Sequence, residues 1–219
     1  MEARIQTTLQ EIARNQSRQL DELKLLVGVA GSPSLGLKTP DSSNTRLPNH
    51  NQITFHRETI AGIGNDRFID GEWIMFQMRF NGSLLFNRTW NEYRDGFGDT
   101  GGEHWLGLDN LHRMLADEPH ELLVVMESLQ GTVVYAHYDT FRIGSALEGY
   151  AIKTIGNYKG TAGNLLFFQA GSKFSTYDQD NDAYEYNCAK LYNGGWWFKN
   201  CYSRKYENNV SQQHTHYST

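Results

Sequence analysis

Residues 174–201 read FSTYDQDNDAYEYNCAKLYNGGWWFKNC and combine three kinds of chemistry in one loop-rich segment. Three aspartates alternate with polar residues near its start: Asp178, Asp180 and Asp182. The only two cysteines of the chain, Cys188 and Cys201, follow them. Aromatic residues and a Gly-Gly pair lie between the cysteines, so acidic, sulfur and aromatic groups are available within one short stretch.

The alternating carboxylates suit a hard cation. Calcium takes roughly six to eight oxygen ligands at about 2.3–2.6 Å, from Asp side chains and from backbone carbonyls of a turning chain. An EF-hand is excluded: with Asp178 at the first position, Ala183 stands where the loop needs Gly and Ala189 where it needs Glu. The residues alone therefore leave two alternatives open, a calcium loop of another kind or an acidic loop without a metal.

The two cysteines also have two interpretations. A disulfide between Cys188 and Cys201 would close a short loop and stabilise the fold by up to about 3 kcal/mol. Two buried free thiols are the alternative, which is common in cytosolic proteins. A zinc site is disfavoured, because neither cysteine has a partner at CxxC or HxxxH spacing.

Taken together with four upstream motifs, this segment resembles the fibrinogen-related domains, the family of ficolins, tachylectins, angiopoietins, tenascins and the fibrinogen gamma chain. The upstream motifs are FNGSLLFNRTWNEYRDGFGD (80–99), GEHWLGLDNLHRM (102–114), YAHYDTFRIGSALEGYAIK (135–153) and YKGTAGN (158–164). The resemblance covers Phe68 to Cys201, about three-fifths of the 219 residues. It implies an α+β fold, with a mixed or antiparallel sheet, short helices and a loop-rich calcium and ligand subdomain.

The resemblance also implies a calcium site. Asp180 and Asp182 match the residues that give the ion their carboxylates, and the backbone carbonyls of Tyr184 and Tyr186 match the remaining protein ligands. Asp178 matches an acidic residue of the family that is not a direct ligand. The implied cofactor is Ca²⁺.

A disulfide between Cys188 and Cys201 and a cis peptide bond between Asn200 and Cys201 are implied in the same way. In members that recognise acetyl groups, an acetamido methyl packs into an aromatic cup while its carbonyl accepts a hydrogen bond. The residues that match this pocket are Tyr192, Trp197, Asn200, Cys201 and Tyr202. Core packing is the alternative role for the aromatic residues in this group.

Local patterns place secondary structure upstream. Thr89 and Glu92 have the spacing of a capping box, which predicts a short helix that carries Trp90 and Tyr93 inward. Asp109 is a candidate cap for a second short helix, with Leu108, Leu111 and Leu115 on one face. Strands are predicted at residues 73–80, 122–127, 132–137 and 150–155.

Three parts are predicted along the chain. Residues 1–27 carry a heptad-like apolar stripe and are predicted to form an amphipathic, coiled-coil-like helix. A homo-oligomer through this helix is one interpretation, and a surface helix or a frayed terminus is the alternative. Residues 28–51 are predicted to be a flexible linker, and 52–219 the fibrinogen-related domain.

The early cysteines of the family and its long segment after Cys201 have no match here, so the domain is expected to be incomplete at its C-terminal end. A strand that this segment returns to the central sheet would be absent, which leaves a sheet edge unpaired.

Composition limits the function. The net charge is −5 and the sequence has no basic patch, so nucleic acid and anionic membranes are poor partners. The sequence has no apolar run of membrane-spanning length, no visible signal peptide and no common catalytic motif, so an enzyme is not expected. Asn81 and Asn87 begin N-x-S/T triplets, which are candidate glycosylation sites in a secreted chain.

The resemblance then predicts an extracellular, secreted lectin. It would bind N-acetylated carbohydrates in a calcium-dependent way, in innate immune pattern recognition. The alternative is a structural or signalling protein that binds a cell-surface receptor or a matrix protein through the same domain.

Overall fold

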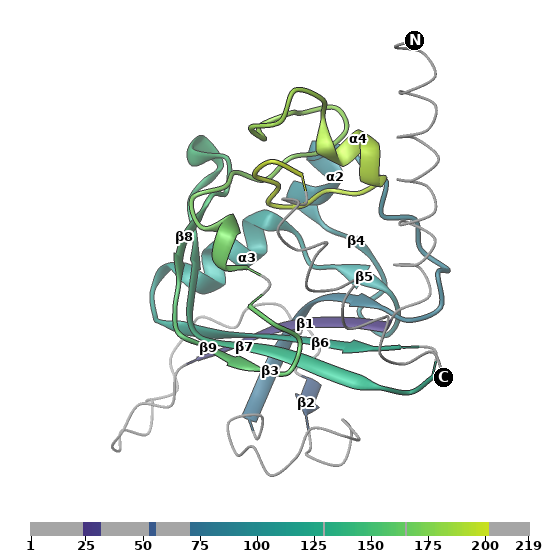
Figure 1. The fold of residues 1–219 in the computed structure, drawn as a ribbon, viewed down its shortest axis with the longest axis vertical. Coiled ribbons are helices and arrows are strands. Elements are labelled where there is room, and N and C mark those ends of the chain that lie inside the picture. The colour runs from purple at the N-terminus through teal and green to yellow at the C-terminus, as the bar shows by residue number, and fades with distance from the viewer. Residues whose placement is uncertain (1–23, 32–52, 56–70, 129, 165, 202–219) are drawn as a thin grey trace, which may run out of the picture.

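The computed structural model of the chain describes residues 24–31, 53–55, 71–128, 130–164 and 166–201 (Figure 1). The strands are β1 (Lys24–Gly31), β2 (Ile53–Phe55), β3 (Gly71–Arg79), β4 (Phe97–Gly98), β5 (His104–Trp105), β6 (His120–Glu127), β7 (Val133–Ile143), β8 (Ile152–Ile155) and β9 (Tyr158–Gly160). The helices are α2 (Trp90–Asp95), α3 (Leu108–Ala116), α4 (Cys188–Tyr192) and two 3₁₀ turns, η2 (Ala146–Glu148) and η3 (Phe167–Gln169).

One antiparallel sheet organises the described residues. Its strand order is β4-β5-β3-β1-β6-β7-β8, with β2 paired to β3 and β9 paired to β7. Every pair of these strands is antiparallel. The predicted α+β class with short helices is therefore confirmed.

The helices lie on one side of the sheet and α4 lies farthest from it (Figure 1). The main core fills the space between them and includes side chains from β1, β3, β6 and β7 together with α2 and α3. A smaller apolar cluster contains Trp73, Met75, Leu123, Val125 and Tyr135. The sheet thus contributes apolar residues to two separate clusters.

The capping box at α2 is confirmed. The Thr89 hydroxyl accepts the backbone N–H of Glu92 at 3.3 Å, and the Glu92 carboxylate accepts the backbone N–H of Thr89 at 2.8 Å. These two bonds satisfy N–H groups that a helix start otherwise leaves without partners. Tyr93 is buried as predicted, with 1% of its surface exposed.

The second helix differs from its prediction at its start. The N-cap of α3 is Gly107, with φ of 105°, rather than Asp109. A left-handed backbone and the close approach of the Arg94 and Asp95 carbonyls explain the glycine at this position. The Asp109 carboxylate instead accepts a hydrogen bond from the Tyr150 hydroxyl. The leucine face is confirmed, because Leu108, Leu111 and Leu115 are all buried.

The prediction for residues 24–31 was wrong. The proposed helix 1–27 and linker 28–51 overlap β1, an inner strand that pairs with β3 on one side and β6 on the other. Val27 and Val29 are 1% and 0% exposed, so the apolar period here is two rather than three to four. Because β1 pairs with both neighbours, no gap is left between β3 and β6. The rest of the proposed helix and linker, 1–23 and 32–51, lies outside the described residues.

Candidate functional site

Aromatic packing fixes the start of the 174–201 segment to the core. Phe174 is fully buried, and its ring lies 5.0 Å from Trp197, 5.1 Å from Tyr93 and 5.6 Å from Trp105, measured between centroids. Ser175 forms an antiparallel bridge with Trp196, so the two arms of the segment are paired at their base. The intervening loop therefore projects from a rigid base.

Side-chain amides shape this loop. The Asn181 amide donates to the Phe174 carbonyl at 2.8 Å, and the Asn181 backbone N–H donates to the Ser175 hydroxyl at 2.9 Å. The Asn187 amide donates to the Thr176 carbonyl at 3.0 Å, while its oxygen caps α4 by accepting the Lys190 N–H. These bonds hold the loop where its backbone has no regular secondary structure.

Asp178 connects the loop to α2. One of its oxygens accepts the backbone N–H of Trp90 at 2.9 Å and the hydroxyl of Thr176 at 2.8 Å. An acceptor at a helix start also matches the positive end of the helix dipole. In this structure Asp178 therefore has an anchoring position between the loop and α2.

Asp180 and Asp182 lie side by side in the loop. The Asp180 carboxylate accepts the Asp182 N–H at 3.2 Å, and the Asp182 carboxylate accepts N–H groups from Tyr184 and Cys188, both at 2.9 Å. Burial raises the pKa of Asp182, and the Asp180 carboxylate adds to the increase. The two backbone N–H groups act in the opposite direction.

This pair fits a hard cation. Two neighbouring carboxylates repel each other, and a cation between them would remove the repulsion and favour the charged forms. The described residues contain no group of three or more acidic, His or Cys side chains that could hold a metal. A site made of two carboxylates and the carbonyls of Tyr184 and Tyr186 does not need such a group.

The disulfide is confirmed. Cys188 and Cys201 are bonded, with their Cα atoms 5.2 Å apart. Cys188 is the first residue of α4, and its backbone N–H is the group that donates to Asp182. The Asp182 side chain therefore joins the acidic loop to the start of the disulfide-closed loop, beside a backbone bond from the Ala183 N–H to the Lys199 carbonyl at 2.7 Å.

The pocket residues have different surroundings. Tyr192 is half-buried and its ring stacks on Phe198 at 6.0 Å, while Asn200 is exposed. Trp197 is only 1% exposed and donates its indole N–H to the Tyr150 carbonyl at 2.7 Å. Trp197 therefore supports this region from the core side. The fifth pocket residue, Tyr202, lies outside the described residues.

The backbone at Cys201 corrects one expectation. The Asn200–Cys201 bond was expected to be cis, but the described residues contain no cis peptide bond. Cys201 instead has a left-handed backbone, with φ of 50°. This conformation turns the chain at the disulfide.

Sequence reasoning missed two structural residues, and one of them, Tyr93, supports the site. The Tyr93 hydroxyl donates to the Phe86 carbonyl at 2.6 Å and accepts the Gly195 N–H at 2.9 Å. A Cβ on Gly195 would lie 2.7 Å from the rings of both Tyr93 and Phe174, so the chain needs glycine there. The Gly-Gly pair was a visible signal, but the tyrosine that it packs on is about a hundred residues away in sequence.

The other missed residue is Glu103, which is 5% exposed and whose carboxylate shapes the turn after β3. One oxygen accepts the N–H groups of three successive residues at 2.6–2.9 Å: Phe80, Asn81 and Gly82. The other oxygen accepts the N–H of Leu84 at 2.8 Å and the Ser83 hydroxyl at 3.2 Å. Burial raises the pKa of Glu103, but these backbone donors outweigh it and bring the value down to about 2. Asn81 and Asn87, the two candidate glycosylation sites in this region, are exposed.

Residues 64–219 match the family model of the fibrinogen beta and gamma chains, C-terminal globular domain. Fibrinogen C domain-containing protein 1 of Xenopus tropicalis is 44% identical over 138 residues, which are 61% of this chain and 30% of that protein. Human microfibril-associated glycoprotein 4 is 44% identical over 137 residues, 60% of this chain and 54% of that protein. The chain thus spans about a third to a half of these relatives. The solved fibrinogen-like globe domain of human ANGPTL6 is 40% identical, with a TM-score of 0.59 over 60% of this chain and 59% of that one.

Proposed function

This chain belongs to the family of fibrinogen C-terminal globular domains, and on that premise we propose that it is a calcium-dependent lectin for N-acetylated glycans. The family consists of extracellular binding modules rather than enzymes. No helix in the described ranges has the length and apolar character needed to cross a membrane. The proposal adds three points to family membership: the ion, the ligand class and export of this chain.

The position of Asp182 carries the proposal. Its two oxygens accept N–H groups from the acidic loop and from the first residue of α4. An ion held by Asp180 and Asp182, with the carbonyls of Tyr184 and Tyr186, would fix the loop and the start of α4 together. Ion binding would therefore be transmitted to the disulfide-closed loop, where the ligand residues lie.

The ligand surface is proposed at Tyr192, Asn200, Cys201 and Tyr202, with Trp197 behind them. Tyr192 stacks on a buried ring, so it offers a positioned aromatic surface for an acetamido methyl. The left-handed backbone at Cys201 turns the chain beside Asn200, which is exposed and carries amide donors. A cup of this kind recognises a small neutral group by one apolar contact and one or two hydrogen bonds.

Isothermal titration calorimetry with N-acetylglucosamine tests the proposal. We expect heat of binding in the presence of calcium and none after a chelator is added, while glucose, which lacks the acetamido group, gives none in either condition. Asp182→Asn should remove both the calcium response and the sugar binding. Glu118→Gln is the matched control, because this exposed residue loses the same charge outside the loop and should leave both unchanged.

A calcium-induced increase in melting temperature with no heat from any N-acetylated sugar would retain the ion site and reject the ligand. No increase in melting temperature with calcium would reject the ion site itself, since a ligand that binds only the folded state must stabilise it.

A second candidate is recognition of a matrix protein or a cell-surface receptor by the same face. The loop exposes a Tyr184–Tyr186 pair, 38% and 42% exposed with rings 6.0 Å apart, and tyrosine is enriched in protein interfaces. One relative is named for its association with microfibrils. Capture of purified microfibril protein that survives excess N-acetylglucosamine would favour this function.

A further inference from the structure

The inner strand β1 comes from outside the part of the chain that matches the family. The match covers residues 64–219, and β1 is Lys24–Gly31. Even so, β1 pairs with β3 over Leu25–Val29 and with β6 over its whole length. The slot between β3 and β6 is thus built by the family domain and filled by an upstream segment.

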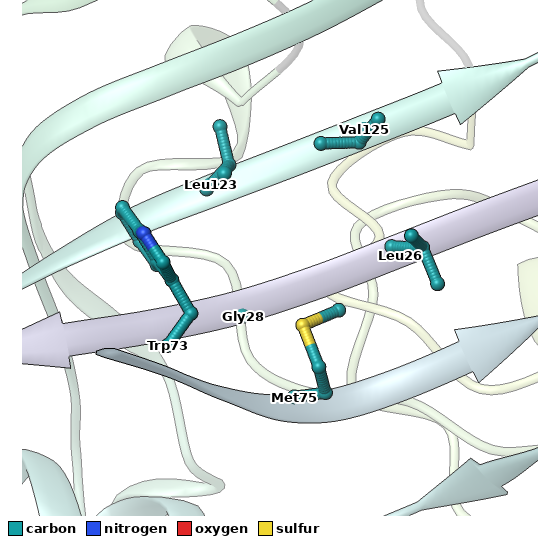
Figure 2. A pocket seen from close by; sticks show the side chains of 6 residues that line it. All are labelled: Leu26, Gly28, Trp73, Met75, Leu123 and Val125. Atoms are coloured by element: carbon teal, nitrogen blue, oxygen red, sulfur yellow. The ribbon is translucent and has the colours of Figure 1, made fainter. Parts of the chain in front are cut away.

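The side chains that line the slot between β3 and β6 restrict which strand fits it. Val27 and Val29 point into the main core and are almost completely buried. On the other face, Gly28 lies between Trp73 and Met75 of β3 and Leu123 of β6 (Figure 2). The slot therefore requires valines on the core face and glycine on the opposite face. Few segments provide this pattern.

Gly28 fixes the register. A Cβ at this position would lie 2.9 Å from the Met75 sulfur and 3.2 Å from the Ile74 carbonyl oxygen. The pairing with β3 also shifts by one residue between Val27 and Gly28, which sets the small residue under Met75. A one-residue slip would move the valines to the wrong face, and a two-residue slip would place Leu26 or Ala30 at the position of Gly28, under Met75.

The connection of β1 to the rest of the domain is a single long segment. Residues 32–52 separate β1 from β2, and this length of chain can span up to about 70 Å when extended. The entropic cost of closing a loop rises only slowly with its length. The contacts of β1 are the same whether it enters the slot of its own chain or that of a neighbour.

We propose that the slot between β3 and β6 also accepts Lys24–Gly31 from a second copy of this chain, so that copies are joined by exchanged β1 strands. Exchange of an identical element is a low-cost route to an oligomer, because every native contact is kept. Residues 1–23, which precede β1, hold most of the apolar stripe, and a homo-oligomer through them would raise the local concentration of neighbouring strands. A partner in this exchange must present a strand with valines on one face and glycine at the centre of the other.

Two full-length chains that each carry one added cysteine besides the Cys188–Cys201 disulfide, Leu25→Cys and Met126→Cys, test the exchange. These two positions are register partners between β1 and β6, and both side chains pack on the main core. The two variants are co-expressed, oxidised gently and run on a non-reducing gel. We expect a disulfide-linked dimer from the mixture, with the bond between positions 25 and 126 identified by peptide mass spectrometry.

A chain that carries both Leu25→Cys and Met126→Cys detects the unexchanged arrangement. When β1 lies in the slot of its own chain, the disulfide between positions 25 and 126 forms within that chain. Adding Gly28→Val to the Leu25→Cys chain should abolish the linked dimer, whereas Gly101→Val, at an exposed glycine with room for a side chain, should not. Each variant is used only if it melts cooperatively, and Gly28→Ala replaces Gly28→Val if the latter does not fold. A co-expressed pair that stays monomeric, while the double variant closes within one chain, overturns the proposal.

Discussion

Replacement of Glu103 by glutamine should destabilise the domain by about 3 kcal/mol at pH 7. A pKa that falls from 4.5 to about 2 corresponds to roughly that preference for the charged form in the folded state. The contacts give a similar value. Glutamine can keep its oxygen towards Phe80, Asn81 and Gly82, but its NH₂ group then faces the Leu84 N–H. A buried donor left without an acceptor costs about 1–3 kcal/mol, and the loss of the charge adds to it.

The pH dependence separates this effect from a simple packing defect. The folded pKa of Glu103 is depressed, so its stabilisation is complete above the unfolded value of 4.5 and is lost as the pH falls towards about 2. The difference between the wild type and Glu103→Gln should therefore decrease from about 3 kcal/mol at pH 7 to about 2 at pH 3.5 and about 1 at pH 2.5.

Urea denaturation followed by tryptophan fluorescence measures this difference, with the disulfide kept oxidised throughout. Glu118→Gln serves as the control, because this exposed carboxylate should give almost the same stability as the wild type at each pH. A difference for Glu103→Gln below about 0.5 kcal/mol at pH 7, or one that does not change with pH, would refute the assignment of the turn to the ionised carboxylate.

Three further outcomes follow from the site. Reduction of Cys188–Cys201 should cost about 3 kcal/mol in the loop-entropy model and lower the melting temperature; unchanged melting would show that the bond is not a support. Tyr93→Phe should cost about 1–3 kcal/mol in denaturant titrations, because the Gly195 N–H loses its acceptor; a loss of a few tenths would contradict this role. Calcium affinity should decrease as the pH falls through the raised pKa of Asp182, because protons compete for its carboxylate; a calorimetric affinity that is flat from pH 7 to 4 would exclude Asp182 as a ligand.

Local signals predicted the elements whose stability is local. The capping box of α2 and the leucine face of α3 depend on residues three or four apart, and both are present as predicted. The disulfide and the α+β class came from the family resemblance and are also confirmed. None of these four predictions required working out which distant segments meet.

The errors lie where distant segments decide the structure. The sequence KLLVGVAG has apolar residues at both helical and strand spacings, and only the slot between β3 and β6 selects the strand. Asp109 has the chemistry of a helix cap, but the hydroxyl of Tyr150, in the turn between η2 and β8, donates a hydrogen bond to it. The function of Glu103 depends on a turn about twenty residues earlier, which no local pattern reveals.

Because β1 pairs with a strand that is synthesised much later, it has no partner in β6 during the first part of translation. Leu25 leaves the ribosome about a hundred residues before Met126, the residue opposite it in β6. At typical translation speeds of about 5–20 residues per second, an apolar strand must wait for seconds before its slot exists. Nascent chains on one polysome would then hold exposed strands beside newly forming sheets.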